Sequence, residues 1–148
     1  MQDWTLSALD PALLPSVLDL LRKCDLPDTG VKENPHGFIV ASVDGTAIGC
    51  CGLERYGSDA LLRSLAVDPM YRGRGIAAWL IARIVAKAEQ ERVSALYLLT
   101  TTARDYFTRH DFDVCPRSEA PEGIRSSWEF RTGCPDSATL MRRAVVCP

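Results

Sequence analysis

The amino-acid sequence predicts a fold in which helices cover a mixed β-sheet, within the α/β or α+β class. Segments with the apolar pattern of strands are interspersed with segments whose apolar residues recur at helical spacing. A hairpin comes early in the chain, and a strand–helix–strand unit occupies its middle. A chain of 148 residues has the length of one ordinary domain, so we expect a single domain over residues 1–148.

The N-terminal segment predicts a strand followed by a helix. Residues 4–9 alternate weakly between apolar and polar side chains, as a strand does. Leucines and a valine at helical spacing follow, with Asp10 expected as the N-cap and Pro11 in the first turn. The helix is expected to end near Cys24, because residues 26–30 have the composition of a turn.

The remaining elements are also expected in a regular order. The β-rich segments 37–43 and 47–53 flank an Asp44-Gly45 turn, which predicts a hairpin. The later elements are expected to be a strand at 61–67, an amphipathic helix at 76–91, a central strand at 95–99, a short helix at 103–110, a short strand at 112–115, a loop, and a last strand at 138–146.

Composition and charge argue against several classes of function. The chain is 47% hydrophobic and 24% charged, has a formal net charge of −2 and carries no basic stripe. Nucleic acid is therefore not an expected partner. No apolar stretch approaches the roughly 18 residues that span a bilayer, and the first residues lack the pattern of a secretory signal. We expect a cytoplasmic protein that binds no membrane.

The six cysteines predict ordinary reduced thiols. An even number is compatible with disulfides, but the cytoplasm keeps thiols reduced. No C-x-x-C or histidine pair gives metal-ligand spacing, so no metal is expected, although a soft-metal site built from three cysteines stays open. The cysteines are Cys24, Cys50, Cys51, Cys115, Cys134 and Cys147.

The most informative segment, residues 65–77, leads from a strand through a glycine-rich loop into an amphipathic helix. Backbone N–H groups at a helix N-terminus lack partners within the helix and carry partial positive charge. Gly73 and Gly75 have no Cβ atom to block an anion, and Arg72 and Arg74 add charged donors. The segment therefore predicts a binding site for a phosphate or pyrophosphate.

Two other phosphate-binding patterns fit less well. Gly73, Gly75 and Ala78 match the dinucleotide fingerprint G-x-G-x-x-G/A. That fingerprint requires a tight turn after the first strand and an acidic residue about 20 positions later. Here the loop lies in mid-chain, and the next strand ends in residues 98–100, without an acid. A P-loop is excluded because no Gly-Lys-Ser/Thr follows the glycines.

The segment resembles the core of the GCN5-related N-acetyltransferase (GNAT) family. The family's pyrophosphate motif, Arg/Gln-x-x-Gly-x-Gly/Ala, corresponds to residues 72–77. A later family pattern, Ala-x-x-aromatic-Tyr-x-x-x-Gly-Phe, corresponds to residues 103–112, with Phe107 in place of the tyrosine and Asp111 in place of the glycine. The resemblance covers residues 38–112 best. It implies a mostly antiparallel sheet of six or seven strands, splayed in the middle and flanked by about four helices.

Two closer similarities concern the acceptor. Residues 98–107 are similar to the catalytic domain of amino-acid acetyltransferases such as N-acetylglutamate synthase. Residues 53–57, 61–67 and 134–138 resemble acetyltransferases encoded in arsenic-resistance operons. The similarities imply acetyl-CoA as the co-substrate and a small amine as the acceptor, either an amino acid or an arsenical relative of one. They leave a homodimer open.

The resemblance also implies how the co-substrate is held. A strand backbone bonds the pantetheine arm as an added strand would, and the amides of the loop hold the pyrophosphate. The residues implied in this binding are Leu65, Ala66, Val67, Arg72, Gly73, Arg74, Gly75, Ile76, Ala77 and Phe107.

Direct transfer to an amine needs a base, an oxyanion donor and a group that protonates or bonds the departing thiolate. Glu54, at the end of a strand beside the splay, is the candidate base, and a solvated carboxylate is the alternative. The backbone N–H of Val67 is the candidate oxyanion donor. Because Phe107 occupies the family's tyrosine position, Tyr106 is either a core aromatic residue or the acid.

Four residues are candidates for contact with the acceptor: Arg63, Ser64, Thr100 and Thr101. Arg63 and Ser64 are expected on opposite faces of their strand, with Arg63 either gripping a carboxylate or paired to a neighbour at the surface. His36 and His110 are expected to have no role. The absence of a tyrosine at position 107 also keeps open a non-catalytic acyl-CoA-binding sensor or interaction module.

Overall fold

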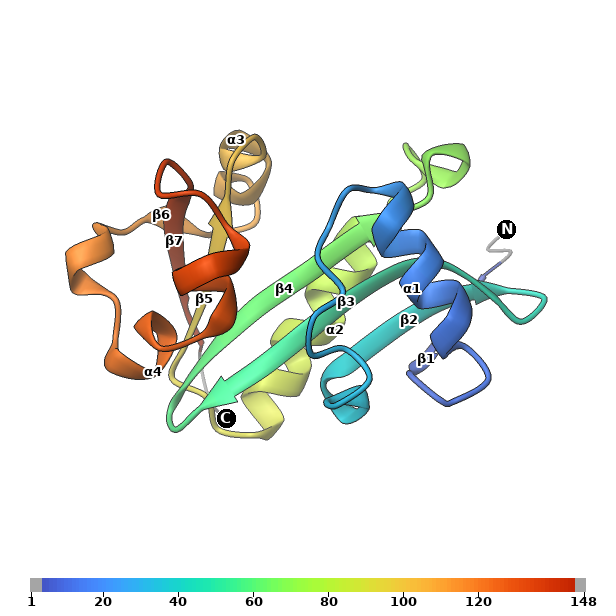
Figure 1. Cartoon of the computed structure of the whole chain (residues 1–148), viewed down its shortest axis with the longest axis horizontal. Helices are drawn as coiled ribbons and strands as arrows, with labels where there is room; N and C mark the ends of the chain where they lie inside the picture. Colours follow the sequence, from blue (N-terminus) through green and yellow to red (C-terminus); the bar gives the residue numbers. More distant parts are fainter. Residues whose placement is uncertain (1–3, 146–148) are drawn as a thin grey trace. The chain divides into compact units, whose positions relative to one another are not determined.

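The computed structural model describes residues 4–145 and contains the predicted mixture of strands and helices (Figure 1). Within these residues a seven-stranded sheet has the order β1-β2-β3-β4-β5-β7-β6. Of the pairings β1–β2, β2–β3, β4–β5, β5–β7 and β6–β7, only β4–β5 is parallel. The strands are β1 (Thr5–Ala8), β2 (Phe38–Val43), β3 (Thr46–Tyr56), β4 (Asp59–Val67), β5 (Ala95–Thr100), β6 (Asp113–Val114) and β7 (Thr139–Ala144). The predicted fold class is confirmed.

The helices lie close to the positions that the apolar spacing predicts, with additional short turns. The α-helices are α1 (Leu14–Lys23), α2 (Ile76–Gln90), α3 (Arg104–Thr108) and α4 (Glu122–Arg125). Shorter turns are the 3-10 helices Pro35–Gly37, Pro69–Tyr71 and Arg117–Glu119 and a π-helical turn, Glu129–Gly133. The sequence predicts only a loop between β6 and β7, because these turns are too short to show helical periodicity.

The chain divides into two compact units. The first comprises residues 1–54 and 63–86, and the second comprises residues 55–62 and 87–148. Strands β3 and β4 and helix α2 each continue from one unit into the other.

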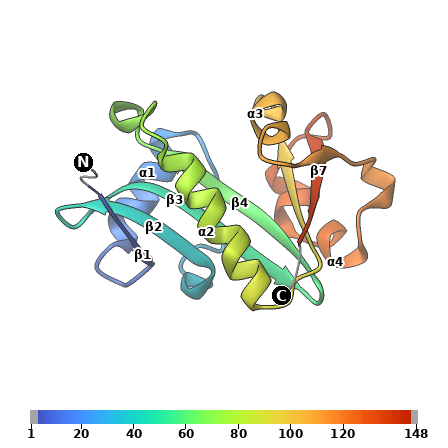
Figure 2. The same cartoon turned by 180° about the vertical axis from the view of Figure 1, so that it is seen from behind.

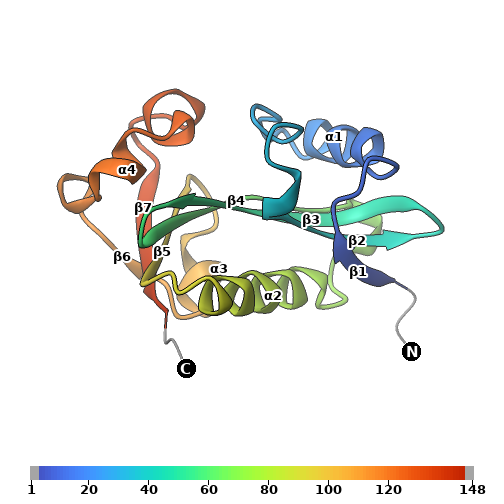
Figure 3. The ribbon, with the colours of Figure 1, turned by 90° about the horizontal axis from the view of Figure 1, so that it is seen from below.

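In the first unit, α1 and α2 cover opposite faces of the strands (Figure 3). Helix α2 runs across β2, β3 and β4 when the molecule is seen from behind (Figure 2). The apolar faces predicted from helical spacing are buried, because each helix needs a sheet face to cover its stripe. The buried residues of the two helices in this unit are Val17, Leu20, Leu21, Ile76, Leu80, Ile81, Ile84 and Val85.

Helix α1 begins later than the sequence predicts. Oδ1 of Asp10 accepts N–H bonds from Ala12 at 2.8 Å and from Leu13 at 3.3 Å. Asp10 therefore caps a turn that precedes the helix, which itself begins at Leu14. The prediction that Asp10 caps α1 is wrong because a separate turn uses the same capping chemistry. The predicted end is confirmed, since Cys24 is the C-cap.

Strand β4 contains an irregularity that strict alternation does not predict. Ser64 has a φ of 57°, in the left-handed region that non-glycine residues rarely adopt. Nε of Arg63 donates a hydrogen bond to Oγ of Ser64 at 2.8 Å, so the two side chains meet. The prediction that they lie on opposite faces is wrong, because alternation requires the extended backbone that Ser64 lacks.

In the second unit, β5 is paired on both sides. The β4–β5 register covers Asp59–Leu61 with Ala95–Tyr97, and all six residues of β5 pair with β7. The unit has its own apolar cluster, which includes Leu61, Tyr97 and Leu140. The predicted last strand, residues 138–146, is observed as Thr139–Ala144, and its final position lies outside the described residues.

The described residues also bear on the membrane and cysteine predictions. Between residues 4 and 145, no helix is long and apolar enough to cross a membrane. None of the five cysteines in that range is in a disulfide, and Cys147 lies outside it. Burial raises the pKa of Cys50 to about 12, so this thiol stays protonated at neutral pH. The same part of the chain holds no group of three or more His, Cys, Asp or Glu residues that could bind a metal.

Candidate active site

The loop between β4 and α2 has the backbone of an anion site. Gly73 and Gly75 have φ values of 80° and 82°, and a Cβ atom added to either would meet no protein atom within 4 Å. Positions 73 and 75 therefore favour glycine because of their positive φ and not because a neighbouring atom would clash with a side chain. The N–H of Trp79 donates to the carbonyl of Gly75 at 3.1 Å, so the N–H groups of residues 75–78 precede the first helical bond.

Asp68 anchors the start of this loop. Its Oδ1 accepts the N–H of Met70 at 2.9 Å, and its Oδ2 lies 2.9 Å from Nζ of Lys23 at the end of α1. The hydrogen bond from Lys23, followed by the bond from Met70, lowers the pKa of Asp68. In turn, the hydrogen bond to Asp68 and the negative charge of that carboxylate raise the pKa of Lys23. The ion pair therefore joins α1 to the beginning of the predicted phosphate loop.

The two arginines of the loop have contacts of their own. Nε of Arg72 donates to the carbonyl oxygen of Val67 at 3.1 Å, and Nη2 of Arg72 lies 3.8 Å from Sγ of Cys24. The Cys24 thiol also donates to the Val67 carbonyl, at 3.7 Å. The Arg74 guanidinium lies 5.0 Å from the centre of the Tyr71 ring. Both arginines are exposed and lie on the predicted phosphate loop, and their contact with phosphate stays a prediction.

The edge of β4 that bears the Val67 amide can be assigned from hydrogen bonds. The N–H of Asp68 donates to the carbonyl of Ile48 in β3 at 2.8 Å. Because successive residues of a strand turn their peptide groups to alternate edges, the N–H and C=O of Val67 face away from β3. The register that joins β4 to β5 comprises only Asp59–Leu61, while β4 continues to Val67. The role of the Val67 N–H as an oxyanion donor stays a prediction.

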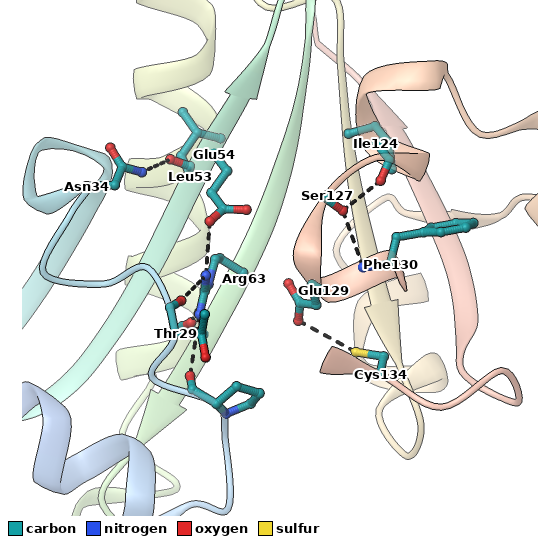
Figure 4. Close-up of polar contacts among 12 residues, drawn as sticks. Thr29, Asn34, Leu53, Glu54, Arg63, Ile124, Ser127, Glu129, Phe130 and Cys134 are labelled. Atoms are coloured by element: carbon teal, nitrogen blue, oxygen red, sulfur yellow. Dashed lines mark hydrogen bonds and ion pairs between the residues drawn. The ribbon is translucent and has the colours of Figure 1, made fainter. Parts of the chain in front are cut away.

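Glu54 is bound to a buried arginine. Oε2 of Glu54 lies 2.9 Å from Nη1 of Arg63, whose side chain is only 4% exposed, whereas that of Glu54 is 20% exposed. Nη1 also donates to the carbonyl of Thr29 at 2.7 Å, and Nη2 donates to the carbonyl of Pro27 at 3.4 Å. Figure 4 shows the side chain of Arg63 between Glu54 and Thr29. Arg63 is thus neither a surface arginine nor a residue that points to solvent.

Tyr106 and Phe107, neighbours on α3, differ in burial. Phe107 is buried, at 7% exposure, and its ring meets that of Phe112 edge to face at 5.8 Å. Tyr106 is half-buried, and its ring centre lies 4.7 Å from that of His110. Tyr106 is therefore not a core residue, because the inward position of this short helix belongs to Phe107. Burial raises the pKa of Tyr106, although Arg109 opposes the shift.

The turn after α3 keeps a glycine-like geometry without glycine. Asp111 has a φ of 68°, and the N–H of Phe112 donates to the carbonyl of Phe107 at 3.1 Å, which closes the end of the helix. Nη1 of Arg143 in β7 donates to the carbonyl of His110 at 2.9 Å. The departure from the family's glycine at position 111 therefore leaves the turn intact.

The two threonines at the end of β5 differ in their surroundings. Oγ1 of Thr100 accepts the N–H of Ala103 at 3.0 Å and so supports the turn into α3. Thr101 is exposed. Contact of either hydroxyl with an acceptor stays a prediction.

Sequence reasoning missed several parts of the site. The carbonyls of Pro27 and Thr29 bind Arg63, but every residue has a carbonyl, so no side-chain pattern marks them. The Lys23–Asp68 pair joins residues 45 positions apart, and residues so far apart are brought together only by the fold. In the second unit, separately from this site, the π-helical turn Glu129–Gly133 was also missed, because five residues show no recognisable periodicity; Figure 4 draws it with the contact between Glu129 and Cys134.

Comparison with known proteins decides the family. The sequence matches the acetyltransferase (GNAT) family over residues 2–112, well over half of its length. The chain belongs to the GNAT family. A GNAT protein of this kind is an N-acetyltransferase that takes its acetyl group from acetyl-CoA. The resemblance predicted from the loop and from residues 103–112 is therefore confirmed.

Individual relatives of this GNAT enzyme fall into two groups. An uncharacterized N-acetyltransferase of Chlorobaculum tepidum is 32% identical over 117 residues, which cover 78% of this chain and 73% of that protein. The amino-acid acetyltransferase of Neisseria meningitidis is 29% identical over 108 residues, which cover 72% of this chain but only 24% of that longer protein.

A solved structure shows the same GNAT fold. N-acetylglutamate synthase from Neisseria gonorrhoeae, complexed with coenzyme A and N-acetyl-glutamate, has a TM-score of 0.86 and 20% identity. The match covers 99% of this chain and 36% of that one. At this identity the likeness shows the fold, while the substrate of this enzyme has to be argued separately.

The residues of this GNAT chain fit the co-substrate that the family uses. The amides of residues 75–78 are at the N-terminus of a 15-residue helix, where a pyrophosphate is stabilised. The positive φ values of Gly73 and Gly75 turn the loop, and a Cβ at either position would enter space that no protein atom occupies. The loop therefore offers backbone donors, with no protein atom against Gly73 or Gly75, and its contact with coenzyme A stays a prediction.

Proposed function

We propose that this GNAT enzyme acetylates the amine of a small amino acid, with Glu54 as the base. The observation that carries the proposal is the Glu54 carboxylate, held by the buried Arg63 and still 20% exposed. The choice of acceptor is supported by the similarity to amino-acid acetyltransferases, which extends over 72% of the chain.

Acetyl-CoA supplies an acetyl group activated as a thioester. The amides of residues 75–78 bind its pyrophosphate, and Leu65 and Val67 bond its pantetheine arm from the β4 edge that faces away from β3. The N–H of Val67 donates to the oxygen that gains negative charge during transfer. Arg72 and Cys24 both contact the carbonyl of Val67, in the peptide group that follows this N–H, so the end of β4 is held before a substrate arrives.

Glu54 prepares the acceptor. An amino acid arrives as an ammonium ion, and only the free amine has the electron pair that attacks a thioester. The carboxylate of Glu54 accepts one proton from the ammonium, directly or through water, and later releases it to solvent. The free amine attacks the carbonyl carbon of the thioester, and the C–S bond breaks as the C–N bond forms. Coenzyme A leaves as a thiolate, and the proton that the nitrogen loses on becoming an amide protonates that sulfur. Ser64 lies beside this ion pair, and no step requires Arg63 to leave Glu54.

A panel assay tests the acceptor. Purified enzyme is incubated with acetyl-CoA and each of the standard amino acids, together with peptides, polyamines and an arsenical amino acid, and release of the CoA thiol is measured. We expect turnover with one or a few free amino acids. The arsenical is included because residues 53–57 and 61–67 resemble acetyltransferases of arsenic-resistance operons. Turnover with peptides or polyamines alone would remove the amino acid from the proposal.

The base is tested by Glu54→Gln, which keeps the size of the side chain and removes its basicity. We expect kcat/KM for the acceptor to fall about 10²-fold at neutral pH, with unchanged CoA affinity. The loss should shrink at high pH, where the amine is already deprotonated. Glu33→Gln, an exposed glutamate of the same unit, is the matched control and should behave as the wild type. A wild-type rate for Glu54→Gln at every pH would eliminate Glu54 as the base.

A further inference from the structure

Arg63 is unusual among the arginines of this chain because its guanidinium is buried. Its side chain is 4% exposed, whereas those of the ion-paired Arg22 and Arg55 are 63% and 48% exposed. Burial of a charge is unfavourable unless the charge is paired and its donors are satisfied. The partners of Arg63 show which groups its charge and its donors hold together.

The partners come from separate parts of the first unit. The guanidinium binds the carboxylate of Glu54 in β3, the hydroxyl of Ser64 in β4, and the carbonyls of Pro27 and Thr29 between α1 and β2. A planar guanidinium holds its donors in a fixed fork, so these groups are set relative to one another as well as to Arg63. Figure 4 shows Glu54 and Thr29 turned toward the same guanidinium.

Two backbone features support this arrangement. Gly30 has a φ of 83°, and a Cβ added there would lie 3.5 Å from Nη1 of Arg63 and 3.7 Å from Oε2 of Glu54. Gly30 therefore brings the loop backbone directly against the ion pair. Ser64 keeps a left-handed φ, which a non-glycine residue maintains only where its surroundings enforce it.

We propose that Arg63 is a positioning residue, which acts through Glu54 by holding its carboxylate and the Pro27–Gly30 segment in one arrangement at the acceptor side of the site. The inference rests on the proposed role of Glu54 as the base. It replaces the expectation that Arg63 itself grips the carboxylate of the acceptor. In this arrangement Pro27–Gly30 forms a fixed wall beside the base, so its position selects which acceptors can present an amine to Glu54.

A double-mutant cycle tests the proposal through turnover. Arg63→Lys keeps the charge but cannot reach all four partners, so we expect kcat/KM for the acceptor to fall about tenfold or more, with unchanged CoA affinity. When Glu54 is already replaced by Gln, Arg63→Lys should lower kcat/KM little further, because Arg63 acts through the Glu54 carboxylate. Arg55→Lys, in the exposed pair with Glu91, is the matched control. The positioning role would be overturned if the fold-losses of the two single variants multiplied in the double variant. A wild-type rate for Arg63→Lys would overturn it as well.

A second measurement is independent of the acceptor. The N–H of Val31 donates to the carbonyl of Asp28 at 3.3 Å, and that of Asn34 donates to the carbonyl of Val31 at 3.2 Å. We expect hydrogen exchange of these two amides to accelerate in Arg63→Lys while α1 stays protected. Unchanged exchange would refute the anchoring, whether or not an amino acid proves to be the acceptor. Conversely, faster exchange in an enzyme that acetylates no amino acid would refute only the proposed function.

Ser64→Ala extends the test if Arg63→Lys fails to fold. It removes the acceptor of the Nε donor and leaves the Arg63–Glu54 ion pair in place. We expect a smaller loss of kcat/KM than in Arg63→Lys and the same accelerated exchange at Val31 and Asn34. Wild-type exchange and turnover in Ser64→Ala would count against the positioning role.

Discussion

Nε of Arg72 lies 3.1 Å from the carbonyl oxygen of Val67, so the first residue of the pyrophosphate motif is tied back to the end of β4. Val67, whose N–H is the predicted oxyanion donor, and the loop that carries the predicted phosphate donors are thereby joined within the first unit. A change in the loop can for that reason affect both coenzyme A binding and the Val67 amide.

Gly75→Asp should abolish coenzyme A binding. It places a Cβ and a negative charge where the pyrophosphate is expected, at a φ of 82°. Gly45→Asp is the matched control, because Gly45 has a φ of 80°, is exposed and also has no protein atom within 4 Å of an added Cβ. Calorimetry with coenzyme A should give no binding for the first variant and wild-type binding for the second. Equal affinities would show that the loop is not the phosphate site.

Tyr106→Phe should lower turnover less than about tenfold. The loss of an acid–base group would instead lower it by roughly 10²–10⁴-fold. The Tyr106 ring packs on His110 and against Phe107 of its own short helix, and the variant keeps that packing. Burial raises the pKa of Tyr106, so the phenol remains protonated at neutral pH and above. Steady-state kinetics with the best acceptor measure the effect. A loss within the larger range would identify Tyr106 as the acid.

Lys23→Met should lower the Tm at neutral pH by removing the ion pair with Asp68. Lys23 lowers the pKa of Asp68 in the folded state. The stabilisation by the ion pair is therefore complete above the ordinary Asp pKa of about 3.9, and it is lost as the pH falls through the lower pKa of the folded state. The Tm difference between variant and wild type should therefore close in acid. Arg22→Met, at a more exposed pair of the same helix, should have a smaller effect. A difference that persists in strong acid would mean that packing, and not the ion pair, is responsible.

Asp111→Ala should destabilise the protein by about 1 kcal/mol, because alanine resists the left-handed backbone of this turn. Asp111 has a φ of 68°, and its ion pair with Arg143 is long, at 3.9 Å, and 82% exposed on the Asp111 side. Asp111→Gly loses the same side chain but accepts the backbone, so it should retain wild-type stability or exceed it. Chemical denaturation of the three proteins provides the comparison. Equal losses in both variants would point to the carboxylate instead of the backbone.

The sequence by itself determined the elements that depend on local patterns. The apolar spacing of α2, the Asp44-Gly45 hairpin and the glycine-rich loop each follow from residues that are neighbours in the chain, and the structure places them as predicted. Helical and strand periodicity, turn chemistry and a phosphate motif are all short-range properties, so one chain is enough to recognise them.

The tertiary structure alone decided how the candidate catalytic groups are held. Alternation suggested that Arg63 and Ser64 point apart, but the left-handed φ of Ser64 brings them together. The sequence left Arg63 either as a surface arginine or as a residue that binds the acceptor. The fold instead surrounds it with a carboxylate and two backbone carbonyls from distant segments. Carbonyls are present at every position and burial is a property of the packed chain, so neither can be inferred from residue identity.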